Sequence, residues 1–94
     1  MYIDDFLWLP DIVDKLAAKH GVTEEEAEEI FFNQPRFRLV ERGYRPGEDV
    51  YTAWGQTSAG RYLVVFFINK PHNRALILSA RAMDDKERRR YERK

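Results

Sequence analysis

The chain has 94 residues, of which 44% are hydrophobic and 34% are charged, and the length is typical of one domain with a core of its own. Cysteine is absent, which excludes disulfides, thiolate metal sites and a cysteine nucleophile. The formal net charge of +0 argues against a strongly basic nucleic-acid binder, and no apolar stretch approaches the length of a membrane span.

This neutral sum hides a division of charge along the chain. Residues 1–34 include 2 basic and 9 acidic residues, a net charge of −7, whereas residues 35–94 include 14 basic and 7 acidic residues, a net charge of +7. We therefore expect a dipolar molecule whose basic half is able to meet phosphate. The opening "MYIDDFLWLP" has no basic residue and does not resemble a secretion signal, so a cytoplasmic protein is expected.

Two helices are predicted in the first third of the chain. Pro10 suits the first turn of a helix, and the apolar residues at 12, 13, 16 and 17 share one face until Gly21, which predicts a helix at roughly 10–20. Thr23 followed by Glu26 forms a capping box, which predicts a second helix to about Asn33. The segment "FLWL" before Pro10 is compatible with a short extra strand.

Four strands are predicted next, because the hydrophobic period falls to two in "RFRLVE", "DVYTAWGQT", "RYLVVFFI" and "RALILSA". Gly60 favours a tight turn, and the short connections predict an antiparallel meander. Asp84 and Glu87 repeat the capping-box spacing, so a last helix is expected from about 85 to 92. The predicted fold is a single α+β domain over 1–94, with two N-terminal helices, a four-stranded antiparallel sheet and a short C-terminal helix.

Arg81 ends the most apolar of these strands. Regular alternation places it on the same face as Ser79 and Ile77, and places Arg74 on the opposite face. Arg61 begins the neighbouring strand, and the beginning of one antiparallel strand lies beside the end of the next. The spacing therefore permits a cluster of Arg61, Ser79 and Arg81.

Strand-end arginines also have a structural interpretation, in which Arg61 and Arg81 pair with Glu41 or Asp49. The last helix is ambiguous in the same way. Arg88 and Arg89 lie four residues after Asp84 and Asp85, so these pairs and the helix dipole account for a solvated basic face. Tyr91 either stacks on a nucleotide or anchors the helix to the sheet.

Histidine is the side chain that most often serves as a general acid or base, so His20 is a candidate for either role. It lies four residues after Leu16, on the predicted buried stripe of the first helix, where a packed structural histidine is the commoner outcome. The other histidine, His72, is expected to be exposed in a loop. Because the two histidines are far apart in the sequence, neither a metal site nor any other cofactor is predicted.

The segments "AAKHGVTEEEAEEIFFNQP", "GQTSAGRYLVVFF" and "ALILSARAMDDKERRRYE" resemble, in order, the signature segments of the BrnT-like ribonuclease toxins of bacterial toxin–antitoxin pairs. The resemblance covers most of the chain. It implies a RelE-like fold, metal-independent RNA cleavage and a small DNA-binding antitoxin as partner.

Metal-independent cleavage needs a base for the ribose 2′-hydroxyl, cations at the phosphorus and an acid for the leaving oxygen. Arginine suits the second role, so Arg61 and Arg81 are the predicted catalytic cations, with His20 as the candidate acid or base. Five further residues are predicted to bind RNA, namely Ser79, Arg74, Arg88, Arg89 and Tyr91. The antitoxin is expected to cover Arg61, Arg81 and the last helix. The alternative is a catalytically inert binding subunit or corepressor that acts through the antitoxin.

Overall fold

The structure is a computed structural model that describes residues 1–93. Five strands and five helical segments follow the chain in this order: β1 (Asp5–Leu7), α1 (Pro10–Lys15), the π-helical η1 (Leu16–His20), α2 (Glu24–Glu29), the 3-10 helix η2 (Ile30–Phe32), β2 (Arg36–Glu41), β3 (Val50–Gln56), β4 (Tyr62–Lys70), β5 (Arg74–Ala82) and α3 (Asp85–Arg93). Within residues 1–93, no helix is both long and apolar enough to cross a membrane.

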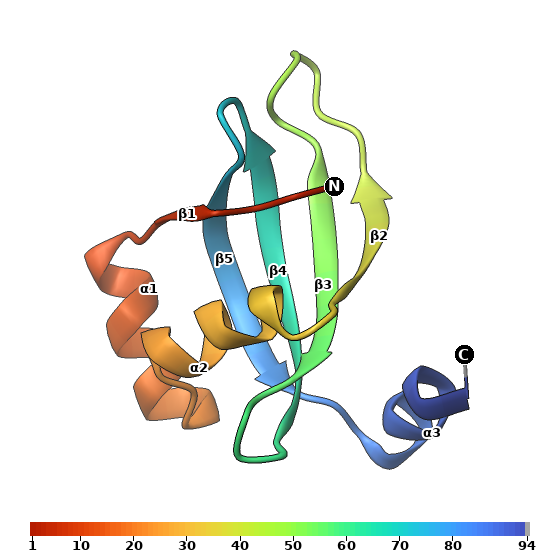
Figure 1. Ribbon diagram of the computed structural model, residues 1–94. Coiled ribbons are helices and arrows are strands. Elements are labelled where there is room, and N and C mark those ends of the chain that lie inside the picture. The colour runs from red at the N-terminus through yellow and green to blue at the C-terminus, as the bar shows by residue number, and fades with distance from the viewer. Residues whose placement is uncertain (94) are drawn as a thin grey trace.

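One sheet runs through the molecule with the strand order β1-β5-β4-β3-β2 (Figure 1). Strands β2 to β5 form the predicted antiparallel meander, and the α+β class is confirmed. The possible extra strand at "FLWL" is present as β1, which overlaps this segment, and the prediction of an antiparallel sheet is wrong in one respect, because β1 is parallel to β5. The backbone N–H groups of Asp4 and Asp5 donate to the carbonyl of Asn73, which holds β1 at this edge.

Each predicted N-terminal helix is present but changes its winding in its last turn. Thr23 and Glu26 form the predicted reciprocal capping box, with Glu26 N donating to Thr23 Oγ1 at 3.1 Å. In η1 the turn widens to the i to i+5 spacing of a π-helix, and Gly21 ends it with a φ of 59°. Leu16 is buried, but the wider turn carries His20 off the buried stripe, so His20 is exposed and the prediction of a packed histidine is wrong.

The hydrophobic core lies between the N-terminal helices and one face of the sheet. Its largest buried side chains include Leu16 and Ile30 from the helices and Leu63, Phe67 and Ile77 from the sheet. Gly55 on β3 allows η2 to approach closely, because a Cβ at that position would lie 2.9 Å from Ile30 Cβ. The opposite face of the sheet has no helical layer over most of its area, and only α3 lies beside its lower end (Figure 1).

A β-bulge in β5 changes which residues share a face. Phe66 pairs with Ser79 and Phe67 pairs with Ile77, so Leu78 is an extra residue without a partner. Ile77 and Ala80 are both fully buried although they are three residues apart. The prediction that Arg81 shares a face with Ile77 is therefore wrong, and so is the prediction that Arg74 lies on the face opposite Arg81.

Candidate functional site

A row of paired residues crosses the open face of the sheet. Arg36 on β2 pairs with Trp54 on β3, Trp54 pairs with Val64 on β4, and Val64 pairs with Arg81 on β5. Directly paired residues point to the same face, so both arginines belong to the face that the N-terminal helices leave uncovered. Neighbouring strands lie about 4.8 Å apart, which places the Arg36 and Arg81 backbones roughly 14 Å from each other.

A groove separates this face from α3. It has a volume of about 440 Å³, and it is lined by four residues of the sheet, including two arginines, and by three residues of α3. We call it the basic groove and define it by Arg36, Arg38, Trp54, Glu87, Arg90 and Tyr91. Three guanidinium groups and two aromatic rings beside a single carboxylate make it suited to a polyanion with flat bases.

Arg81 does not line the basic groove itself, but it is held by Glu87, a lining residue of the groove in the first turn of α3. Its Nη1 donates to Glu87 Oε1 at 2.7 Å and its Nη2 to Glu87 Oε2 at 2.8 Å. This two-point contact lowers the pKa of Glu87 from 4.5 to about 2, and it raises the pKa of Arg81. Glu87 also accepts from the backbone N–H of Asp84, so the carboxylate is fixed by the predicted capping box of α3.

One edge of the Arg81 guanidinium remains available. Nη1 makes a further contact with the Ala82 carbonyl at 3.3 Å, but no residue of 1–93 accepts from Nε. The Nε–H and the second Nη2–H form the side edge of the guanidinium fork, whose geometry matches two oxygens of a phosphate. Arg81 therefore has the geometry to hold a carboxylate with one edge and a phosphate with the other.

The helix α3 has no buried residue, and polar and aromatic contacts attach it to the sheet. The Tyr91 ring lies 6.0 Å from the Tyr62 ring, and the Arg36 guanidinium lies 4.8 Å from the centre of the Tyr91 ring. The Arg88 guanidinium covers the Tyr62 ring at 4.3 Å. Tyr91 thus anchors α3 in this structure, while its ring still lines the basic groove.

Arg61 and His20 lie together, but away from Arg81. Arg61 Nη1 donates to the Gly21 carbonyl at 2.7 Å and to Glu26 at 3.1 Å, and its Nη2 donates to the His20 carbonyl at 3.2 Å. Arg61 alternates with Tyr62 and therefore points to the helix-covered face, whereas Arg81 points to the open face. The structure does not bring Arg61 into a cluster with Ser79 and Arg81.

The remaining predicted site residues divide between the groove and its surroundings. Ser79 shares the open face with Arg81 and pairs with Phe66, as predicted. Arg74 is on this face too, but it lies at the opposite end of β5 and donates to the Pro71 carbonyl. Arg89 is exposed on α3 beside Lys86.

The family comparison covers most of this structure. A family model described as "Ribonuclease toxin, BrnT, of type II toxin-antitoxin system" matches residues 8–87. The chain belongs to the BrnT family. A comparison with curated proteins finds no match. Membership of a type II toxin–antitoxin family implies an antitoxin as partner, and the matched range includes Arg36 and Arg81 of the open face and Glu87 of α3.

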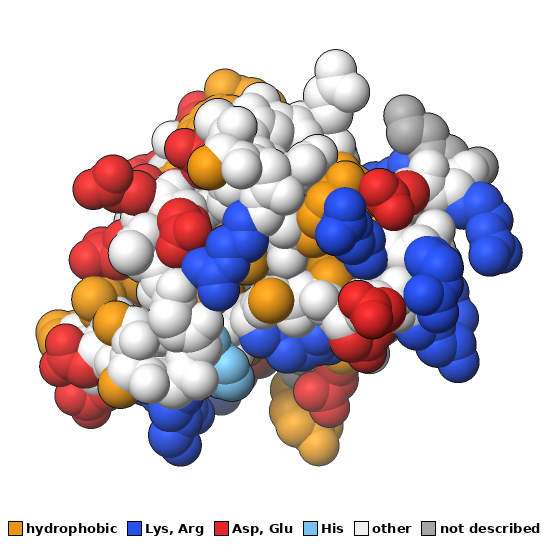
Figure 2. All heavy atoms as spheres, turned by 90° about the horizontal axis from the view of Figure 1, so that it is seen from below, with side chains coloured by type: hydrophobic (Ala, Val, Ile, Leu, Met, Phe, Trp, Pro, Cys, Tyr) orange, Lys and Arg blue, Asp and Glu red, His pale blue; other side chains and the backbone are white. Residues whose placement is uncertain are grey.

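The charge of this BrnT-family chain is divided in space as well as along the sequence. Figure 2 looks at the lower end of the sheet and shows Lys and Arg side chains gathered around α3, with most Asp and Glu side chains towards α1 and α2. Because the basic groove lies on the α3 side, a polyanion would meet it with the acidic helices turned away.

Sequence reasoning missed five residues of the BrnT-family groove, namely Arg36, Arg38, Trp54, Glu87 and Arg90. A signal for two of them was present. In "RFRLVE" the arginines alternate with Phe37 and Leu39, which places both arginines on the face opposite the core side chains. Trp54 carried no such signal, since an aromatic residue within a strand is expected to pack in the core.

Acid should release α3 through Glu87. Because its pKa in the folded protein, about 2, is below the ordinary 4.5, its stabilising contribution is complete above pH 4.5 and is lost as the pH falls towards 2. We expect the melting-temperature difference between wild type and Glu87→Gln to shrink across this window. Thermal melts at stepwise lower pH measure it, and a difference that stays constant down to pH 2 would contradict the assignment.

Proposed function

We propose that this chain is a metal-independent endoribonuclease toxin of RelE-like fold that cleaves RNA by attack of a ribose 2′-hydroxyl. The observation that carries the proposal is the guanidinium of Arg81 on the open face of the sheet. Glu87 holds one edge of this guanidinium, and the other edge, which can donate two hydrogen bonds to a phosphate, has no acceptor among residues 1–93. Family membership supports the ribonuclease activity. The groove supports a single-stranded substrate, because it offers aromatic rings as well as cations.

The chemistry assigned to Arg81 is stabilisation of the pentacoordinate phosphorus. In this step the 2′-oxygen forms a bond to phosphorus, the bond from phosphorus to the 5′-oxygen breaks, and negative charge grows on the two non-bridging oxygens. A guanidinium that stays ionised and donates two parallel N–H bonds strengthens its contacts as that charge grows. Arg36, Arg38 and Arg90 then hold the flanking phosphates in the basic groove. The products are a 2′,3′-cyclic phosphate and a 5′-hydroxyl.

The proton from the 2′-hydroxyl needs an acceptor. Glu87 is the carboxylate that contacts Arg81, but with a pKa of about 2 it is a weak base at neutral pH. We therefore assign most of the rate to arginine stabilisation, treat Glu87 as a positioning residue, and assign to solvent water both the uptake of the 2′-hydroxyl proton and the delivery of a proton to the leaving 5′-oxygen. The low basicity of Glu87 also favours the second candidate function, a catalytically inert subunit or corepressor that acts only through its antitoxin.

Purified protein incubated with a free single-stranded RNA, with and without a chelator, separates these two functions. The endoribonuclease proposal expects cleavage that a chelator does not change. Absence of cleavage by a folded protein favours the inert subunit, and cleavage that is lost with the chelator contradicts the metal-independent mechanism.

We propose that the partner is a DNA-binding antitoxin that blocks the basic groove. A partner placed there reaches Arg81 and α3 on the open face, where acidic and aromatic residues would complement the groove. It need not reach Arg61, since that side chain contacts the helical layer on the other face. Co-purification followed by hydrogen-exchange mapping tests this, and protection confined to α1 and α2 would contradict a blocking partner.

Arg89→Ala should weaken RNA binding only modestly. The side chain is exposed and no residue of 1–93 forms a salt bridge with it, so its contribution is a long-range attraction to phosphate. We expect a loss of roughly two- to fivefold in affinity at low salt that shrinks as salt rises, because screening removes exposed charge effects. RNA binding measured at several salt concentrations checks this, and a large loss of affinity that does not depend on the salt concentration would contradict it.

A further inference from the structure

A second hollow adjoins the basic groove at the lower end of the sheet. It has a volume of about 860 Å³ and lies between the end of η2, the end of β3 and α3. Its lining includes Asn33, Gln34, Gln56 and Ser58, together with Arg36 and Tyr91, which it shares with the basic groove. A strand of RNA lying in the basic groove would therefore pass directly beside this hollow, which is large enough for a nucleobase.

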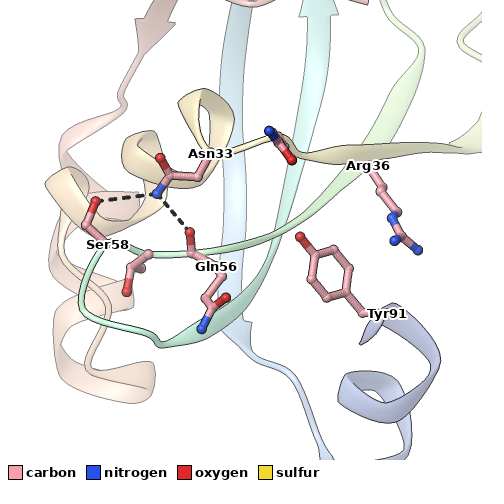
Figure 3. A pocket seen from close by; sticks show the side chains of 7 residues that line it. Asn33, Arg36, Gln56, Ser58 and Tyr91 are labelled. Atoms are coloured by element: carbon pink, nitrogen blue, oxygen red, sulfur yellow. Dashed lines mark hydrogen bonds between the residues drawn. The ribbon is translucent and has the colours of Figure 1, made fainter. Parts of the chain in front are cut away.

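The wall formed by the ends of η2 and β3 is held rigidly. Asn33 Nδ2 donates to the Gln56 carbonyl at 3.0 Å and to Ser58 Oγ at 3.5 Å, as the dashed lines in Figure 3 mark. The backbone N–H of Ser58 donates to Glu29 at 2.6 Å. The Gln56 side-chain nitrogen donates to the Gly60 carbonyl at 3.2 Å, and no residue of 1–93 donates to Gln56 Oε1. The wall thus presents an oriented acceptor.

The opposite wall offers donors and a flat surface. Figure 3 shows Tyr91 reaching up from α3 across the hollow from Asn33, Gln56 and Ser58, with Arg36 on the far side of the ring. The Arg36 guanidinium lies 4.8 Å from the ring centre, so it is held over an aromatic face. Aromatic rings and guanidinium planes are the surfaces on which proteins stack unpaired RNA bases.

Gln34 at the rim has a strained backbone. Its φ of 52° is a left-handed conformation that residues other than glycine rarely adopt. Strain of this kind concentrates at ligand sites, where the surrounding structure imposes it.

We infer that this hollow, the base pocket, binds a guanine of the single-stranded RNA whose phosphate contacts Arg81. This inference rests on the proposed function. Guanine presents N1–H and the 2-amino group as adjacent donors, which match Gln56 Oε1, and its two-ring base can stack on the Tyr91 ring that Arg36 supports from the far side. Uracil has no exocyclic amino group and only one ring, so it matches the acceptor less well and stacks over a smaller area.

The polar lining favours a nucleobase over a protein side chain. Protein hot spots are anchored in apolar pockets, whereas three amides and a hydroxyl surround this one and Tyr91 supplies its aromatic surface. An apolar side chain of a partner would leave these amide groups without hydrogen bonds, which costs binding free energy.

Short 2′-fluoro RNA oligonucleotides test the base pocket independently of cleavage, because they lack the attacking hydroxyl. Four pentamers that differ only in the central base are titrated with wild-type protein, and binding is followed by fluorescence anisotropy. We expect the guanine pentamer to bind about tenfold more tightly than the uracil pentamer, the scale of one good base contact. Gln56→Leu should bring this ratio close to one.

Two further variants serve as controls, and thermal melts confirm that all are folded. Gln56→Glu keeps an acceptor, so it should keep the guanine preference while lowering affinity for every pentamer. Asn69→Leu changes an amide at the other end of the sheet and should keep the wild-type ratio.

Equal affinity of wild type for the four pentamers overturns the inference, and so does the absence of binding to any of them. If no pentamer binds and Gln56→Leu weakens the antitoxin complex, the hollow is a protein contact instead. A guanine preference in a protein that fails to cleave ordinary RNA supports the base pocket while it overturns the ribonuclease proposal, so the two failures are distinguishable.

Discussion

Arg81→Ala is expected to slow RNA cleavage by a factor on the order of a hundred or more, the scale seen when one donor to a transition-state oxyanion is removed. The reason is the side edge of the guanidinium, from which no residue of 1–93 accepts a hydrogen bond while Glu87 holds the other edge. Single-turnover cleavage of a radiolabelled RNA by folded variants measures this effect. Equal cleavage rates for wild type and Arg81→Ala would contradict the assignment of Arg81 to transition-state stabilisation.

Two matched variants separate phosphate contact from helix docking, because Arg81→Ala also removes the partner of Glu87. Glu87→Gln loses the ion pair but keeps the guanidinium, so it should slow cleavage much less than Arg81→Ala does. Arg81→Lys keeps a positive charge but loses the two-pronged fork, and it should recover only part of the rate. If Glu87→Gln costs as much as Arg81→Ala, the loss comes from a displaced α3 and not from phosphate contact.

Arg61→Ala should lower stability more than it lowers the intrinsic rate of cleavage. The guanidinium ties Glu26 to the carbonyls of His20 and Gly21, which closes the end of η1 and the start of α2 onto the sheet. Hydrogen bonds to charged groups stabilise by about 1.5–3 kcal/mol, and because a third of this side chain is exposed we expect the lower half of that range. The corresponding fall in melting temperature is roughly 10 °C.

Arg74→Ala is the matched control, since Arg74 also lies at the start of a strand, but within residues 1–93 its side chain donates to the Pro71 carbonyl alone. It should melt within a few degrees of wild type. If Arg61 has the catalytic role predicted from the sequence, Arg61→Ala should instead abolish cleavage and leave stability nearly unchanged. An Arg61→Ala variant that melts like wild type but fails to cleave RNA would support that role and contradict the structural one.

The elements of this fold were accessible from the sequence because their local signals agree. The alternation in "RFRLVE" and the capping residues Thr23 and Asp84 predicted β2, α2 and α3 close to their observed bounds. The parallel pairing of β1 was not accessible, because it depends on contacts with the Asn73 turn, which is about 70 residues away in the chain. Local patterns do not encode such a pairing.

The predicted site was wrong for residues whose face of the sheet the local sequence pattern does not determine. "YLVVFFI" is apolar at every position, so the pattern does not show which face of the sheet each residue occupies. Leu63 and Phe67 face the helical layer, and Arg61 shares that face because it lies two residues before Leu63. The bulge at Leu78 lies in another unbroken apolar run, "ALIL", and it changes the face of each residue after it. The exposure of His20 depends on a π-helical turn that helical periodicity does not anticipate.

The chemical nature of the cleavage products tests the central proposal most directly. Attack by a 2′-hydroxyl with stabilisation by Arg81 leaves a 2′,3′-cyclic phosphate on one fragment and a 5′-hydroxyl on the other. Mass spectrometry of the fragments from a short RNA, compared with the same RNA carrying a single 2′-deoxynucleotide at the cleaved position, gives both readouts. We predict cyclic phosphate ends and no cleavage of the deoxy-substituted RNA. Fragments with 5′-phosphate ends, or cleavage at the deoxynucleotide, would contradict the proposed mechanism.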